Sequence, residues 1–209
     1  SGGTDVGGGL LPLHFDTTIL LSGSDENPLQ WSGSIINHEI GHFVMDQYSR
    51  PPGEVGIHYL SAPESPGLAF SEGYATWDGQ AALSAEQPAP NPIYFAVQQG
   101  TAFYIDLSSA MASSGMIPLP DPRGSIDQQI GEIAVASIAW DLWSNEGDIP
   151  VLSGITLPRV TSGLNRGYKT IDLVDFADAL LCGGRVSAQQ MNSSMSKYGF
   201  PWDNQPLCP

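Results

Sequence analysis

The sequence has little positive charge. Its 209 residues include only 7 Lys and Arg against 22 Asp and Glu, which gives a net charge of −15. Because no basic cluster is present, a nucleic-acid partner is not expected. No apolar run approaches the roughly 20 residues that a membrane-spanning helix needs, so no membrane span is expected either.

Cysteine is also scarce. The two cysteines, Cys182 and Cys208, both lie in the last 30 residues of the chain. A disulfide between them would tie the C-terminal tail to the end of a helix, which fits an oxidising compartment. The alternative is two free thiols in a cytosolic protein. The acidic, lysine-poor composition favours a secreted or extracellular protein.

What the chain does contain is enough apolar sequence for a core, since hydrophobic residues make up 41% of it. We expect an α+β fold that is mostly helical, with a small N-terminal sheet. Helices are expected at 31–49, 68–85, 125–144, 170–184 (with Thr170 as N-cap) and 187–199 (with Ser187 and Gln190 in capping-box spacing), a strand within 14–21, and either a hairpin or, preferably, a helix at 93–107.

The strongest motif is "HEIGH", which runs from His38 to His42. Two histidines four residues apart lie on one face of a helix, so their rings can converge on one metal ion, and zinc suits imidazole ligands. In this motif Glu39 is the general base that takes a proton from water. The alternative is a pair of ordinary surface or core histidines.

A catalytic zinc site needs a third protein ligand. The metzincin continuation is excluded, because its Gly and His positions are occupied by Met45 and Tyr48. Among the remaining candidates (His58, Glu54, Glu64, Glu72, Asp46 and Asp78), Glu72 stands out. It sits among apolar residues in "FSEGYATW", where an unpaired carboxylate would be costly. The adjacent Gly73 predicts a close approach between helices.

Together, "HEIGH" and "FSEGYATW" resemble the gluzincin branch of zinc metallopeptidases, and "SEGYAT" is similar to the ligand signature of the M1 aminopeptidases. The resemblance covers roughly residues 31 to 85. It implies that His38, His42 and Glu72 bind Zn²⁺ and that Glu39 is the general base and acid. It also implies a zincin-like catalytic domain over 1–209, with an upper lobe (1–117) that carries the zinc-binding helices and a helical lower lobe (118–209).

Two departures narrow this expectation. The 29-residue connection between His42 and Glu72 is longer than in the aminopeptidases or the thermolysin type, and the short chain resembles the compact minigluzincins. The Gly-x-Met-Glu-Asn motif, which holds a substrate amino terminus in the aminopeptidases, is absent. The resemblance therefore implies an endopeptidase that acts on peptide or protein substrates.

Other residues are candidates for supporting roles. Metal-binding histidines usually donate their second ring nitrogen to an oxygen. The thermolysin type has an aspartate one turn after the glutamate ligand; that position is Thr76 here, so Asp78 and Asp46 are the candidate partners. For the donor that stabilises an oxyanion we favour Tyr168 over Tyr104.

Two further residues lie outside this scheme. Glu132 lies in a helix that is apolar nearly all round, so it faces a cleft, a ligand amine or a buried partner such as Arg166. His58 is expected in a loop near the rim of the cleft.

Three functions remain open from the sequence. The leading one is a zinc-dependent metalloendopeptidase. The second is a catalytically silent binding or scaffolding module on a cell surface that keeps zinc for stability, although such a module has no use for Glu39. The third is a zinc hydrolase of non-peptide amides or esters.

Overall fold

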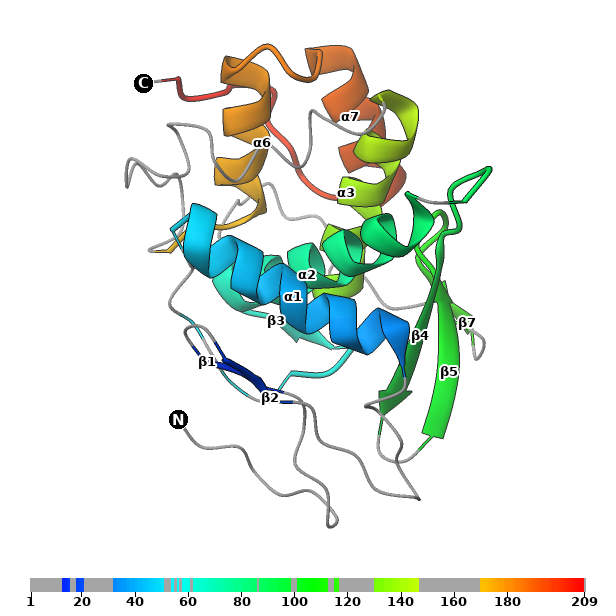
Figure 1. Cartoon of the computed structure of the whole chain (residues 1–209). Coiled ribbons are helices and arrows are strands. Elements are labelled where there is room, and N and C mark those ends of the chain that lie inside the picture. Colours follow the sequence, from blue (N-terminus) through cyan, green and yellow to red (C-terminus); the bar gives the residue numbers. More distant parts are fainter. Residues whose placement is uncertain are drawn as a thin grey trace.

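The computed structural model describes residues 13–15, 18–20, 32–50, 54, 56, 58–60, 62–85, 87–98, 101–112, 115–116, 130–146 and 170–208. Over these residues the fold is α+β and mainly helical, as predicted. Its helices are α1 (Gly33–Tyr48), α2 (Pro66–Ser84), α3 (Glu132–Glu146), α6 (Leu173–Cys182) and α7 (Ala188–Lys197). Helix α2 packs against α1, α3 and α6, and Figure 1 shows α3, α6 and α7 grouped above α1 and α2 in this view.

Helix α2 is the centre of the molecule, because nearly all its side chains are buried. Phe70, Tyr74 and Trp77 are each at most 1% exposed and belong to the hydrophobic core, which α3, α6 and α7 complete. Pro66 occupies the first helical turn, where its missing N–H costs no hydrogen bond. Helix α1 begins at its N-cap Ser32, whose side chain accepts a hydrogen bond from the Ile35 amide.

In the described part of the chain, the strands form three small antiparallel sheets. The β1 (Leu13–Phe15) and β2 (Thr18–Leu20) strands pair as a hairpin, so the predicted strand within 14–21 is two short ones. Strands β4 (Ile93–Gln98), β5 (Thr101–Asp106), β6 (Met111–Ala112) and β7 (Gly115–Met116) form a four-stranded sheet in that order. Strands β3 (Pro63–Glu64) and β8 (Ile130–Gly131) form the third sheet.

Three local predictions were wrong. Residues 93–98 and 101–106 pair as the antiparallel strands β4 and β5, which is the hairpin alternative and not the preferred helix. Residues 130–131, expected to be helical, pair with β3 instead, and α3 begins at Glu132. The N-cap of α6 is Asp172 and not Thr170, because the Asp172 carboxylate accepts hydrogen bonds from the Val174 and Asp175 amides.

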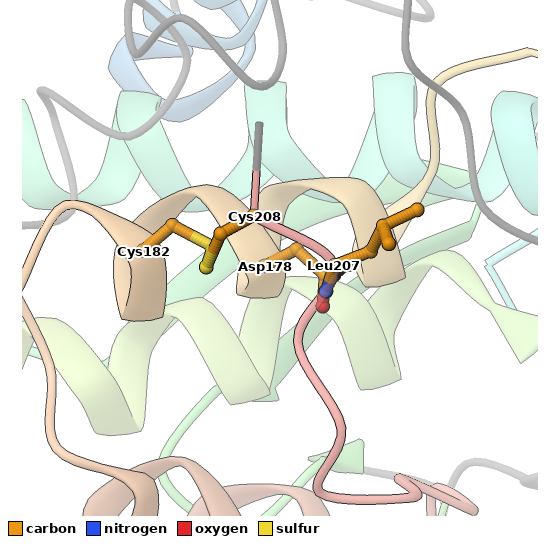
Figure 2. Close-up of a disulfide and its surroundings, with 4 residues drawn as sticks. All are labelled: Asp178, Cys182, Leu207 and Cys208. Carbon is orange, nitrogen blue, oxygen red and sulfur yellow. Dashed lines mark hydrogen bonds between the residues drawn. A yellow bond between two sulfur atoms is a disulfide. The ribbon is translucent and has the colours of Figure 1, made fainter.

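The C-terminal region follows the prediction more closely. Ser187 and Gln190 form the expected capping box at the start of α7. Cys182 and Cys208 form a disulfide that joins the tail to the last residue of α6, and Figure 2 shows this bond beside the hydrogen bond from the Leu207 amide to Asp178. A disulfide is compatible with an extracellular protein. In the part of the chain described above, no helix is both long and apolar enough to cross a membrane.

Candidate metal centre

His38 and His42 lie on the face of α1 that packs against α2. Their ring centroids are 4.7 Å apart, and their Nε2 atoms are 3.1 Å apart. His38 is buried and His42 half-buried. The helical spacing therefore brings the two rings together as the motif predicted.

Glu72 reaches the same point from α2. Its Oε2 atom lies 3.2 Å from the Nε2 of His38 and 3.1 Å from the Nε2 of His42. The 29-residue connection thus brings the second helix back against the first, and the three expected ligands converge on one point.

This convergence depends on a close approach of the two helices. A Cβ on Gly41 of α1 would lie 2.8 Å from the Ala75 Cα of α2. A Cβ on Gly79 of α2 would lie 2.7 Å from the backbone nitrogen of His38. Both glycines face backbone atoms, so any larger residue would push α1 away from α2 and separate the histidines from Glu72.

The three donor atoms fit a metal ion well. In a tetrahedral zinc site with ligand distances of about 2.0–2.1 Å, neighbouring ligand atoms lie ~3.3 Å apart. The mutual distances of 3.1–3.2 Å among His38, His42 and Glu72 are close to this value. The donor set of two imidazoles and one carboxylate suits zinc and several other first-row metals.

Hydroxyl groups lie behind both rings. The Nδ1 of His38 is 3.0 Å from the Oγ1 of Thr76, and the Nδ1 of His42 is 3.4 Å from the Oγ of Ser71. When each Nδ1–H donates to its hydroxyl oxygen, both Nε2 lone pairs point at the Glu72 carboxylate. Three electron-rich atoms at such distances repel one another unless a cation lies between them.

Glu39 is the next residue of α1 after His38. Its side chain is largely buried, at 7% exposure, and its charge helps to raise the pKa of His42. Among the described residues, nothing hydrogen-bonds to its carboxylate. A carboxylate near the histidine pair, not engaged elsewhere in that part of the chain, is available to accept a proton.

His58 and Glu132 meet on the other side of Glu72. The Nδ1 of His58 lies 2.6 Å from the Oε2 of Glu132, and its Nε2 lies 3.4 Å from the Oε2 of Glu72. The β3–β8 pairing brings the loop of His58 beside the start of α3. The close approach predicted at Gly73 is also present: a Cβ there would lie 2.5 Å from the carbonyl oxygen of Glu132, so its partner is α3.

Charge dominates the protonation of these groups. Burial alone would raise the pKa of Glu72, but the positive charge of His42 and hydrogen bonds from His38 and His42 hold it well below its ordinary value. Burial alone would lower the pKa of His42, but the Glu72 charge raises it. In the same way, the hydrogen bond to Glu132 and the charge of Glu72 overcome burial and raise the pKa of His58 to about 10. The cluster is thus rich in negative charge and attracts a cation.

The residues expected to support the metal ligands or to stabilise an oxyanion are found in different places. Asp78 and Asp46 were the candidate partners of the ligand ring nitrogens, and the structure places Thr76 at the Nδ1 of His38 and Ser71 at the Nδ1 of His42. Tyr104 is 56% exposed and packs against Phe95 on the sheet. Tyr168, the favoured oxyanion donor, and Arg166 lie outside the described residues, so their roles stay predictions.

Several residues of this site are not indicated by the sequence. Thr76 stands where the thermolysin type has an aspartate, and its hydroxyl is a sufficient acceptor for His38. Tyr94 of β4 is buried, and its hydroxyl hydrogen-bonds Thr76, which extends the support behind His38. His58 and Glu132 were each singled out, but nothing in the sequence paired them.

Comparison of the chain with protein-family models finds no match. Comparison with curated proteins and with solved structures finds none either.

Proposed function

We propose that the protein is a zinc-dependent metalloendopeptidase. The observation that carries this proposal is the convergence of His38, His42 and Glu72 on one point, with Glu39 beside them. The gluzincin resemblance of the two helices that supply these residues points to the same activity. A metal that only stabilises the fold would not need Glu39.

In this mechanism His38, His42 and Glu72 would hold the metal ion. The chemistry that zinc supplies in such a site is polarisation of a carbonyl group and a lower pKa for water. Thr76 and Ser71 orient the two rings, so that their Nε2 atoms face the ligand position.

Glu39 moves the proton. Its carboxylate accepts a proton from water as the water oxygen forms a bond to the carbonyl carbon of the peptide. The same carboxyl group then gives that proton to the departing nitrogen as the C–N bond breaks, so the products are a carboxylic acid, which keeps the second hydrogen of the water, and a free amine. The buried position of Glu39 beside the histidine pair supports this role.

The test uses the Glu39→Gln variant. We expect the purified protein to bind one zinc ion per chain and to cleave casein, with loss of cleavage on addition of a chelator. Glu39→Gln should retain zinc but lose about 10²- to 10⁴-fold in kcat, since it removes the proton acceptor. Asp203→Asn, the same change at an exposed aspartate in the C-terminal tail, is the matched control and should leave both properties unchanged.

Two outcomes would reject the proposal. Full cleavage by Glu39→Gln would rule out this mechanism. Absence of chelator-sensitive cleavage in the zinc-loaded protein, together with a large fall in Tm on metal removal, would favour the zinc-stabilised binding module instead.

A further inference from the structure

The contact between His58 and Glu132 has no part in the mechanism above. Its two members are 74 residues apart in the chain and meet at a distance of 2.6 Å. The imidazole lies between two carboxylates, since its other nitrogen faces Glu72 at 3.4 Å. An ionised carboxylate can only accept hydrogen bonds, so a ring between two of them is best paired when both nitrogens carry hydrogen.

Glu132 fixes the orientation of this ring. The Glu132 side chain is fully buried at the first position of α3, and among the described residues its Oε1 atom has no hydrogen-bond partner. A buried carboxylate needs compensation, and the short bond from His58 supplies it. Glu132 therefore holds the Nε2 of His58 toward the metal centre.

This pair could instead be half of a second metal site, because His58, Glu72 and Glu132 form another group of donor atoms. The distance argues against that assignment. Ligand atoms around one tetrahedral metal lie ~3.3 Å apart, whereas 2.6 Å between His58 and Glu132 is the length of a charge-assisted hydrogen bond.

His58 is also the most accessible member of the cluster. Its side chain is 32% exposed, compared with 11% for His38, 16% for His42 and 12% for Glu72. A substrate that approaches the metal centre from solvent would therefore meet this ring. The long 3.4 Å contact with Glu72 can be exchanged for a shorter one to the substrate.

We propose that His58, oriented by Glu132, is a catalytic residue that donates its Nε2–H to the carbonyl oxygen of the scissile peptide as that oxygen becomes anionic. This inference rests on the proposed peptidase function. The donated hydrogen bond stabilises negative charge that exists in the transition state and not in the free substrate. Removal of one such donor typically lowers kcat by about 10²- to 10³-fold.

The experiment compares His58→Ala, Glu132→Gln and the control Tyr59→Phe, which changes an exposed side chain in the same loop. We expect one zinc per chain in all of them. His58→Ala should lose about 10²- to 10³-fold in kcat on a casein-derived peptide with little change in KM. Glu132→Gln should lose less, because the ring remains but is held more loosely, and Tyr59→Phe should match the wild type.

A second readout does not depend on turnover. A phosphonamidate peptide carries a tetrahedral anion, whereas acetohydroxamate binds a metal through its own two oxygens. His58→Ala should weaken phosphonamidate binding, measured by calorimetry, by about the same factor as kcat and leave acetohydroxamate binding unchanged. Glu39→Gln provides the separate test of the peptidase function, because it removes the base and leaves this donor in place.

Three results would overturn the inference. Unchanged kcat and phosphonamidate affinity in His58→Ala would show that the ring is not a donor. Loss of zinc in that variant would make His58 a ligand, and two zinc ions per wild-type chain would assign the pair to a second metal site. If the wild type cleaves no peptide at all, the proposed function itself fails.

Discussion

Thr76 acts on the site through a single hydroxyl group. It is fully buried, and its Oγ1 contacts the Nδ1 of His38 and the hydroxyl of Tyr94. Thr76→Val keeps the shape of the side chain but leaves the Nδ1 of His38 without its partner. We expect zinc affinity to fall by about 10- to 100-fold, measured by competition with a chromophoric chelator.

The control for Thr76→Val is Ser144→Ala, which removes an exposed hydroxyl from α3. Its zinc affinity should equal that of the wild type. Equal affinity in Thr76→Val would show instead that packing alone orients the ring of His38.

The buried carboxyl group of Asp78 should make the stability of the protein depend on pH. Burial raises its pKa to about 6, whereas an aspartate in the unfolded chain has a pKa of about 4. Between these values the native state holds a proton that the unfolded state releases, so the contribution of Asp78 to stability falls as pH rises. Above pH 6 the free-energy cost of burying the ionised Asp78 carboxylate is constant, at most about 3 kcal/mol for two pKa units.

Asp78→Asn should therefore stabilise the protein at pH 8 and have little effect at pH 4. Urea unfolding at the two pH values measures the difference, with Asp203→Asn as the exposed control. Equal effects of Asp78→Asn at both pH values would mean that the carboxylate is not destabilised by burial.

At the scale of elements, the site depends on how closely α1 and α2 pack. Gly41→Ala would place a methyl group against the backbone of Ala75, and overpacking of this kind costs about 1–3 kcal/mol. Among the described residues, the same substitution at Gly33 of α1 meets only the Leu83 side chain, at 3.5 Å, so it should be neutral or slightly stabilising. Thermal unfolding and zinc affinity of the two variants measure the contrast, and equal behaviour would refute the close-packing argument.

Elements with strong local signals were predictable from the sequence. Helix α1 has an N-cap serine and ends before the Pro51–Pro52 pair, and α7 has a capping box, so neighbouring residues define each. The sequence left the β4–β5 hairpin as one of two alternatives, because "IYFAV" is apolar at successive positions and shows no clear alternation. The strand state of β4 depends on its pairing with β5, which the apolar pattern of "IYFAV" does not show.

The residues of the site also differ in how well the sequence predicts them. His38 and His42 were predictable because four residues along a helix determine their geometry, and Glu72 followed from the resemblance of its surroundings. The His58–Glu132 contact depends on the pairing of β3 with β8, which involves only two residues on each strand. Such a short pairing leaves no recognisable pattern in the sequence, so only the folded structure brings these two side chains together.

At the scale of the whole molecule, the disulfide links elements that do not form the metal centre. Cys182 and Cys208 close a loop of 26 residues that contains α7. Loss of a cross-link over a loop of this length costs about 3.5 kcal/mol in the chain-entropy account. The double variant Cys182→Ser/Cys208→Ser should therefore unfold at lower urea concentration, by the same amount as the reduced wild type.

Zinc affinity and cleavage at 25 °C should change little in that variant, because the ligands come from α1 and α2, whereas the disulfide joins α6 to the tail. The two measurements separate stability from the site: a fall in unfolding free energy with constant zinc affinity is the expected result. A parallel loss of zinc affinity would show that the C-terminal region, through the contact of α6 with α2, also controls the distance between the histidine pair and Glu72.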